Sequence, residues 1–518
     1  MATISTIKEN HYQDSMKLMQ ISQKLSALTG IRQAAAIMAT EANLAMLKEA
    51  GLIKDIPSNV SANDLIVAVE AQSAKLGEEA IDKLDSLLMP IDTGAESSVQ
   101  YKYLETAYGA LPGANIAVVS VPGEYAKLEV AKAIEKGMHT FLFSDNLTLD
   151  EEIELKQRAS GRGLLVMGPG CGTAIINGIG LGFANVVERG PIGVIAAAGT
   201  GMQEVTSLID NLGSGVSHAI GVGGRDLSKE VGGIMTLDAI GMLERDESTK
   251  ALLIVSKPPS AEVAEAIASR IRETNMHAVV CFLGSDMKNL EDGKIIFTKT
   301  LEEAALEALR LVVKKGRRPE IQPDKNWKKQ TEKVMKALGP KQKYLRGLYS
   351  GGTLCYETQQ VLTPVLGPIH SNAPLNKAEK LKDSNKSVGH SCIDLGEEEF
   401  TVGRPHPMID ASLRSERLLK ESARPDVAVI LLDIVLGFVA SPDPAGDLIP
   451  AIREAKDRAR KKGRTLAFVA HVCGTEKDPQ GLIAQENKLR EEGVMVFPTN
   501  ALAAKAAGWI VSRGGGKL

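Results

Sequence analysis

A strand, a turn of small residues and the start of a helix follow one another twice in this chain of 518 residues. The first copy is the apolar run 192–198 with the turn Gly199-Thr200-Gly201, and the second is the run 344–349 with the turn Ser350-Gly351-Gly352-Thr353. Small residues leave the backbone N–H groups of such a turn accessible to an oxyanion, and the helix N-terminus adds a partial positive charge. A lone turn of this kind often serves close packing only. Two copies predict two similar α/β domains whose helix ends face one shared anion.

Composition and charge restrict the classes of protein to which the chain can belong. Aromatic residues make up only 4% of the chain, which argues against a stacking platform for single-stranded nucleic acid. The formal net charge of −3 gives no electrostatic basis for binding nucleic acid or a membrane surface. The N-terminus lacks the apolar core of a signal peptide, and no apolar run is long enough to span a bilayer. We therefore expect a cytoplasmic protein without nucleic-acid or membrane partners.

The cysteines are few and scattered. They lack CxxC spacing and are odd in number, which fits a reducing compartment and indicates neither a structural zinc site nor a disulfide framework. We expect no metal. The five positions are Cys171, Cys281, Cys355, Cys392 and Cys473.

Strand and helix patterns divide the chain into blocks. Short apolar runs alternate with helical patterns in a small N-terminal α/β unit, residues 1–95, and 94–98 resembles a linker. The alternation continues through 96–188, restarts over 189–315 and returns over 344–518, separated from the rest by a Lys- and Pro-rich linker at 316–343. The polar loop 371–391 is expected to be exposed. Strands that alternate with helices of this length predict a multidomain α/β protein with parallel sheets.

Several motifs resemble the subunits of succinyl-CoA synthetase. Residues 114–173 resemble the latter part of the CoA-binding domain of the α subunit, on the motifs at 120–123, 144–146 and 167–172. The segments 193–204 and 221–226 resemble the ligase domain of that subunit. The third block resembles the β-subunit ligase domain, on the segments 350–353, 393–396 and 432–437.

Essentially the whole chain is similar to the FdrA family of acyl-CoA-synthetase-like proteins. The motifs that carry this similarity are FSDN at 143–146, MGP at 167–169, GGRDLS at 223–228 and TVGRPHPMID at 401–410. The resemblance implies a Rossmann-type CoA-binding-like domain (96–188) followed by two flavodoxin-like ligase domains (189–315 and 344–518). It implies a CoA-like pocket, and CoA is the cofactor that it suggests. The residues carried over to this pocket are Pro122, Gly123, Asp145, Asn146 and Cys171.

Three features of the synthetases are not found. Their phosphohistidine lies in a loop that corresponds to 284–297, and this chain has no histidine there. The glycine-rich first turn of their CoA-binding domain is not recognisable in 1–113, and no ATP-grasp domain is visible. The phosphoenzyme relay of the synthetases is therefore not expected.

Four cationic or titratable residues are candidates for chemistry at the anion. Arg225 and Lys257 follow predicted strands, where open α/β sheets place their ligands. Arg404 and His406 lie in a Gly-Arg-Pro-His-Pro segment that two prolines stiffen. Arginine matches a phosphate or carboxylate with two hydrogen bonds, and histidine exchanges protons near neutral pH. Two alternative interpretations stay open. Lys257 could be a solvated loop lysine, and His406 could serve only to cap backbone carbonyls.

The FdrA resemblance implies a subunit of oxamate carbamoyltransferase, which interconverts oxamate plus carbamoyl phosphate and oxalurate plus phosphate in allantoin and purine breakdown. Its ligands are an acyl or carbamoyl phosphate and a carboxylate substrate, and partner subunits complete a hetero-oligomeric enzyme. One alternative is an acyl-CoA synthetase of the NDP-forming succinate-CoA ligase type. Another is a non-catalytic scaffold that binds an acyl-CoA or a partner subunit.

Overall fold

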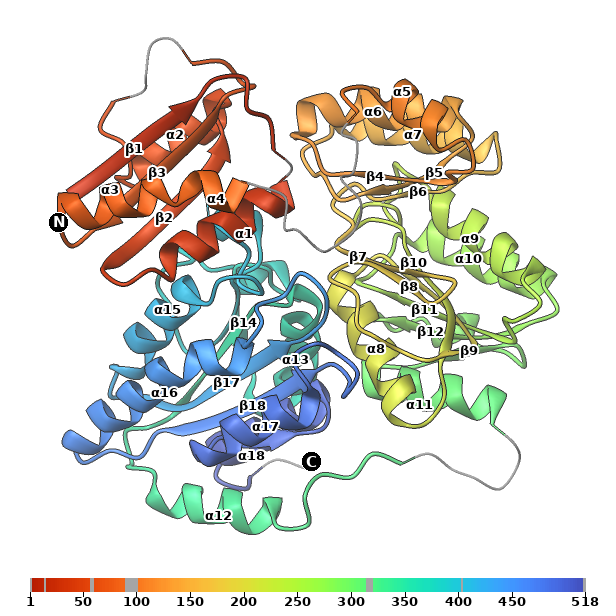
Figure 1. Cartoon of the computed structure of the whole chain (residues 1–518). Coiled ribbons are helices and arrows are strands. Elements are labelled where there is room, and N and C mark those ends of the chain that lie inside the picture. Colours follow the sequence, from red (N-terminus) through yellow and green to blue (C-terminus); the bar gives the residue numbers. More distant parts are fainter. Residues whose placement is uncertain are drawn as a thin grey trace.

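A computed structural model of the chain describes residues 2–13, 15–55, 60–88, 101–313, 320–401 and 404–515. Within these ranges the strands form four sheets, each in a separate part of the chain (Figure 1). The expected linker at 94–98 lies outside the described residues, as do residues 316–319 of the linker 316–343 and Val402 and Gly403 of the proline-stiffened segment.

The N-terminal unit is a three-stranded antiparallel sheet in which β3 lies between β1 and β2. Alternate residues of the strands face opposite sides, so that Ala34 and Ala36 pack with α1 while Ala35 and Ile66 pack with α2. The apolar run at 31–38 predicts a strand, which the structure confirms as β2, whereas the sequence did not predict β1 or α1. Its elements are β1 (Ala2–Lys8), α1 (Ser15–Ser26), β2 (Ile31–Met38), α2 (Glu41–Glu49), β3 (Leu65–Ala71), α3 (Ala74–Asp82) and α4 (Leu84–Leu88).

The second unit holds a short parallel sheet of order β4-β5-β6. Helix α7 begins with a capping box in which Thr148 and Glu151 satisfy each other's backbone N–H groups. The elements are α5 (Leu104–Ala110), β4 (Ile116–Val119), α6 (Gly123–Glu135), β5 (His139–Leu142), α7 (Leu149–Ser160) and β6 (Val166–Met167).

The third unit is built on a seven-stranded sheet of order β13-β12-β11-β9-β10-β7-β8. Strands β9 to β13 are parallel, and the hairpin β7-β8 adds an antiparallel edge. Because this hairpin precedes residue 189, the sheet starts before the expected domain boundary. The elements are β7 (Thr173–Ile176), β8 (Ile179–Gly182), β9 (Arg189–Ala196), α8 (Gly199–Asn211), β10 (Val216–Gly221), α9 (Ile234–Arg245), β11 (Ala251–Ser256), α10 (Ala261–Glu273), β12 (His277–Phe282), η1 (Lys288–Leu290), β13 (Ile295–Phe297) and α11 (Leu301–Val312).

The fourth unit is a six-stranded parallel sheet of order β15-β16-β14-β17-β18-β19. Side chains of α13 and α18 pack on one face of the sheet, and those of α15 and α16 pack on the other. The elements are α12 (Trp327–Ala337), β14 (Tyr344–Tyr349), α13 (Gly352–Leu366), β15 (Ile369–His370), η2 (Lys377–Glu379), β16 (His390–Asp394), α14 (Glu398–Thr401), α15 (Ser412–Ser422), β17 (Val427–Val435), α16 (Pro444–Lys461), β18 (Ala467–Cys473), α17 (Leu482–Glu491), β19 (Met495–Phe497) and α18 (Asn500–Val511).

The expectation that the loop 371–391 is exposed is wrong for part of it, because Ser371, Asn372 and Ser387 are buried. The side-chain amide of Asn372 can be buried because its hydrogen bonds are satisfied. It donates to the carbonyl of Asp394 and accepts from the N–H of Asp394, both at 2.9 Å, so this polar side chain extends the edge of the sheet.

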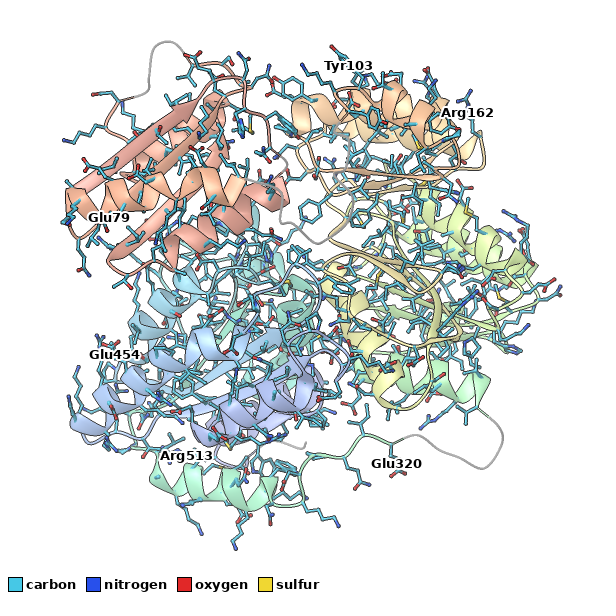
Figure 2. All side chains as sticks on the ribbon, in the orientation of Figure 1. Glu79, Tyr103, Arg162, Glu320, Glu454 and Arg513 are labelled. Atoms are coloured by element: carbon cyan, nitrogen blue, oxygen red, sulfur yellow. The ribbon has the colours of Figure 1, made fainter. Side chains whose placement is uncertain are left out.

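The third and fourth units share one hydrophobic core. Buried residues of α8 and α11 pack in the same cluster as residues of α13 and α18. Charged side chains such as Glu79, Arg162 and Glu454 extend outward from the units (Figure 2). The multidomain α/β class with parallel sheets is confirmed. Among the described helices, none has both the length and the apolar composition that a membrane span requires.

Candidate functional site

The N-termini of α8 and α13 meet at the interface of the two shared-core units. The N–H of Thr353 donates to Oγ1 of Thr200 at 3.3 Å. A β-carbon at Gly201 would lie 2.8 Å from Cγ2 of Thr353, and one at Gly351 would lie 2.8 Å from Cγ2 of Thr200. The prediction that the two turns approach each other is confirmed. The contact is close, so no phosphate fits directly between the two threonines, and a shared anion would lie at the edge of the contact.

The two turns differ in their free donors. In the second turn, the N–H groups of Ser350 and Gly351 donate to the buried carboxylate of Asp433 at 2.9 and 2.7 Å, and Arg414 pairs with the same carboxylate at 2.6 Å. In the first turn, the N–H groups of Gly199, Thr200 and Gly201 have no acceptor within the described part of the chain. Donor capacity for an external anion therefore comes mainly from α8, because Asp433 already accepts two of the four N–H groups of the second turn and Thr200 accepts a third.

Asp394 ends strand β16 beside this contact and is buried. Its Oδ1 accepts the N–H of Gly396 at 2.9 Å, and a β-carbon at Gly352 would lie 2.3 Å from its Oδ2. Burial raises the pKa of Asp394 to about 7, the carboxylate of Glu397 adds to the rise, and the ammonium of Lys257 opposes it. A carboxyl group that titrates near neutral pH is suited to general acid or base catalysis.

Lys257 reaches this group from the other unit. Its Nζ lies 3.8 Å from Oε1 of Glu397 and 5.7 Å from the ring centre of Tyr356. It is only partly exposed, with 43% of the side-chain surface accessible. Lys257 thus lies near a carboxylate and an aromatic ring across the domain interface, and both its role at the anion and the alternative of a solvated loop lysine stay predictions.

His406 lies next to the same glycine. A β-carbon at Gly396 would be 2.7 Å from Nε2 of His406 and 3.2 Å from Oδ1 of Asp394. Nδ1 of His406 accepts the N–H of Met408 at 3.3 Å, so the neutral ring carries its proton on Nε2, which faces Gly396. Burial lowers the pKa of His406 to about 4. His406 is thus neutral at pH 7, where it offers a hydrogen bond rather than the acidic proton that its sequence context suggested.

The remaining two cationic candidates have different surroundings. Arg404 is partly buried, and its N–H donates to the carbonyl of Thr401 at 3.1 Å. Arg225 is not brought to the turns. Its Nε pairs with Glu152 at 2.7 Å and its Nη2 donates to the carbonyl of Leu147 at 2.8 Å, which ties α7 to the seven-stranded sheet.

Four of the five residues assigned to a CoA-like pocket adjoin one another. A β-carbon at Gly123 would lie 2.4 Å from the carbonyl oxygen of Asp145 and 2.9 Å from Cβ of Asn146, so the turn at Pro122 and Gly123 contacts the turn after β5. Cys171 is different. Its Sγ lies 3.3 Å from the carbonyl of Thr173, and burial raises its pKa to about 12. This thiol is a packed side chain without thiolate reactivity, and CoA binding by the other four stays a prediction.

Three potential metal ligands lie together in the shared core, namely Glu204, His471 and Cys473. Nε2 of His471 is 2.6 Å from Oε2 of Glu204, and Nδ1 is 3.1 Å from the carbonyl of Phe497. Burial disfavours the charged ring, but the Glu204 carboxylate more than offsets this and raises the pKa of His471. A direct bond of 2.6 Å identifies an ion pair that links α8 to β18. The expectation of no metal stays a prediction.

The chain is 39% identical over 512 residues to the uncharacterized protein YahF of Escherichia coli, covering 98% of both chains. The chain belongs to the YahF family. Three domain families match segments of the chain. They are CoA-ligase (residues 348–510), a CoA binding domain (187–283) and the AllF heavy metal-associated domain (1–102). The first two place the protein among acyl-CoA-synthetase-like proteins.

More distant relatives cover a part of the chain. The ADP-forming sulfoacetate-CoA ligase subunit SqwL of Acholeplasma is 29% identical over 32% of this chain and 56% of its own length. The succinate–CoA ligase subunit alpha of Staphylococcus epidermidis is 26% identical over 33% of this chain and 57% of its own length. An acetyl-coenzyme A synthetase structure from Candidatus Korarchaeum cryptofilum matches with a TM-score of 0.28 at 15% identity, over 77% of this chain and 83% of that chain.

The N-terminal unit lacks the thiolates that a heavy-metal centre commonly uses. Soft metals are bound by thiolate and thioether groups, and imidazole binds zinc, copper and nickel. The sequence 1–102 contains no cysteine and one histidine, His11, whose Nε2 lies 3.3 Å from the side-chain nitrogen of Gln13. We assign no metal chemistry to this unit.

Sequence reasoning missed Asp394 and Asp433 as members of the site. Both belong to motifs quoted for the β-subunit resemblance, and both stand at or near the carboxyl ends of buried parallel strands. A carboxylate at such a strand end is itself a signal, because open sheets place their ligands there.

Proposed function

We propose that the protein is the subunit of a carbamoyltransferase that binds carbamoyl phosphate at the edge of the contact between α8 and α13. The observation that carries the proposal is the meeting of the two helix N-termini. The N–H groups of Gly199–Gly201 have no acceptor among the described residues, and the ammonium of Lys257 acts on Asp394 at the same interface. Helix dipoles and N–H groups favour a phosphate there. The absence of a histidine from 284–297 favours a bound acyl phosphate over a phosphoenzyme.

The proposed chemistry needs one base and one cationic site. Asp394, as the carboxylate, takes a proton from the amide nitrogen of oxamate, and this nitrogen attacks the carbamoyl carbon. The bond from that carbon to the phosphate oxygen breaks, the electron pair leaves with phosphate, and oxalurate is released. Lys257 and the N–H groups of α8 stabilise the leaving phosphate. We infer that Arg404 and the Nε2–H of His406 orient the oxamate carboxylate and that partner subunits complete the enzyme. Buried free thiols fit a reducing cytoplasm.

A second function, an acyl-CoA ligase, is favoured by the matches to CoA-ligase and CoA-binding families. The contact between the turns at Gly123 and Asp145 also supports it, because the uncapped N-terminus of α6 lies there and would suit a CoA phosphate. This function needs a nucleotide site that the chain would obtain from a partner.

Phosphate release separates the two functions. The chain, reconstituted with its partner subunits, is given carbamoyl phosphate with and without oxamate, and oxalurate is identified by mass spectrometry. A parallel reaction supplies ATP, CoA and succinate and is assayed for thioester. Oxamate-dependent phosphate and oxalurate support the transferase, whereas CoA-dependent thioester without oxalurate supports the ligase and refutes our main proposal.

A matched pair of glycine variants tests the position of the site. In Gly201→Ala, the new methyl group meets Thr353 at 2.8 Å and forces the two turns apart, so we expect a large loss of activity. In Gly224→Ala, the methyl group meets nothing within 4 Å, and activity should be retained. Equal activity of the two variants would place the reaction elsewhere.

A further inference from the structure

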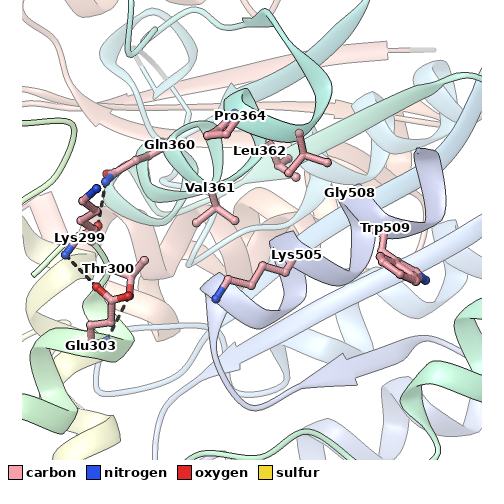
Figure 3. Close-up of a pocket in the computed structure, with 11 residues that line it drawn as sticks. Lys299, Thr300, Glu303, Gln360, Val361, Leu362, Pro364, Lys505, Gly508 and Trp509 are labelled. Carbon is pink, nitrogen blue, oxygen red and sulfur yellow. Dashed lines mark hydrogen bonds between the residues drawn. The ribbon is translucent and has the colours of Figure 1, made fainter. Parts of the chain in front are cut away.

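A groove lies between the third and fourth units, away from the contact of the two turns. It has a volume of about 360 Å³, within the range of small-molecule sites. Figure 3 shows its walls, which come from the start of α11, the second half of α13 and the end of α18. Its lining residues are Lys299, Thr300, Glu303, Gln360, Val361, Leu362, Pro364, Val365, Lys505, Gly508 and Trp509.

The α13 and α18 walls of the groove are apolar and firmly packed. Val361, Pro364 and Val365 of α13 and Trp509 of α18 supply the apolar lining. The two helices are close because residue 508 is glycine, where a β-carbon would lie 2.8 Å from a methyl group of Leu362. An apolar body, aromatic or aliphatic, would be desolvated on these walls.

The charged lining of the groove consists of two lysines and one carboxylate. Lys299 comes from one unit and Lys505 from the other, and among the described residues neither ammonium takes part in an ion pair. The carboxylate of Glu303 in the same wall accepts the backbone N–H of Lys299 at 3.0 Å. Lys505 also interacts electrostatically with Glu302, which lies outside the groove lining. The carboxylate of Glu302 accepts a hydrogen bond from the Thr499 hydroxyl at 2.6 Å.

Gln360 connects the groove with the candidate site. Its Nε2 donates to the carbonyl of Lys299 at 2.9 Å and its Oε1 accepts the N–H of Gly284 at 2.8 Å. Gly284 lies against Tyr356, since a β-carbon there would be 3.2 Å from the Tyr356 ring, and Lys257 lies over the same ring. One side chain of the groove therefore fixes the loop that follows β12.

We propose that this groove is a binding site for a small organic anion, in which a carboxylate, sulfonate or phosphate meets Lys299 and Lys505 and an apolar body covers Val361 and Trp509. The site is separate from the proposed carbamoyl-phosphate site and does not depend on that function. Two cations without ion pairs beside an apolar wall select this class, because a neutral apolar molecule leaves the ammonium groups unused and an inorganic anion leaves the apolar wall wet.

The test compares two fluorescent probes that differ in one charged group, 1-anilinonaphthalene-8-sulfonate and its uncharged analogue N-phenyl-1-naphthylamine. The full chain carries two tryptophans, so Trp327→Phe serves as the background and energy transfer from Trp509 reports binding in the groove. We expect saturable binding of the sulfonate at one site per chain. The double variant Lys299→Met, Lys505→Met should weaken it about tenfold and leave the uncharged probe unchanged.

The control is Lys333→Met, an exposed lysine of α12 outside the groove, which should not alter either affinity. A melting curve of each variant excludes unfolding as the source of probe binding. Three results would overturn the proposal: no energy transfer from Trp509, equal affinity for both probes, or sulfonate affinity that the double lysine variant leaves unchanged.

Discussion

Asp394→Asn separates stability from activity at the candidate site. The carboxyl group is buried at the end of β16, accepts the N–H of Gly396 and faces the N-terminus of α13 at Gly352. Asparagine keeps the shape and one acceptor oxygen but has no charge. We therefore expect the variant to fold, to be more stable than the wild type above neutral pH, and to lose activity.

The magnitude follows from the pKa of Asp394, which burial raises from 3.8 to about 7. Between these values the folded state holds a proton that the unfolded state has released, so stability falls as pH rises. One pKa unit corresponds to about 1.4 kcal/mol, so the ionised group costs the fold up to about 4 kcal/mol at pH 8. Removal of the charge should recover about 1 to 4 kcal/mol at pH 8 and little at pH 4.

The assay is a pair of profiles across pH 4 to 9, one of melting temperature and one of carbamoyl transfer by the reconstituted enzyme. A general base contributes about a hundredfold to ten-thousandfold in rate, and the wild-type rate should rise through pH 7 as Asp394 ionises. Glu397→Gln is the matched variant, because its carboxylate helps to raise the pKa of Asp394. That variant should move the rising limb to lower pH and retain activity.

The prediction about stability and the prediction about activity can be refuted independently. A melting temperature of Asp394→Asn that is below the wild type at pH 8 would refute the buried, proton-holding carboxyl group. Full activity in a well-folded variant would leave the electrostatic argument standing and remove Asp394 as the base.

Three further predictions test other parts of the reasoning. Arg404→Lys keeps the charge but not the two-pronged hydrogen bonding, so turnover should fall about ten- to hundredfold with an unchanged melting temperature; unchanged turnover would place Arg404 outside the site. Incubation with ATP or carbamoyl phosphate should give no acid-labile, base-stable phosphate, because 284–297 lacks histidine, and its detection would show that another histidine is phosphorylated. Glu204→Gln removes the buried partner of His471 at 2.6 Å and should cost about 3 to 5 kcal/mol, measured by denaturant unfolding, whereas Glu454→Gln on the surface should cost under about 0.5 kcal/mol; equal costs would contradict the structural role of the buried pair.

The same pair determines a pH dependence with a defined sign. Although burial opposes the charge of His471, the Glu204 carboxylate raises its pKa above the ordinary value of 6.5. The stabilisation is therefore complete below pH 6.5 and is lost as pH rises through the higher folded pKa.

Local sequence determined most of the secondary structure of this protein. The strand at 31–38 and the helix at 261–273 begin and end where the apolar periodicity places them, because a strand or helix that buries one face must repeat its apolar residues with period 2 or 3.6. The repeated glycine turn also predicted correctly that α8 and α13 would meet. Strand β1 was missed, since its polar alternate residues give an edge strand little hydrophobic signal.

Only the tertiary structure decided which groups are free to act at the site. The sequence makes the two turns look equivalent, yet the folded sheet brings Asp433 from β17 onto the N–H groups of Ser350 and Gly351. The N–H groups of Gly199–Gly201 in α8 have no acceptor among the residues that the structure describes. The tertiary structure also pairs Arg225 with Glu152, away from the turns. It buries His406, so that the imidazole ring is neutral at pH 7. Burial and charge partners arise from segments distant in the chain, so a pKa or an ion pair is a property of the fold, whereas the residue type and its strand end are properties of the sequence.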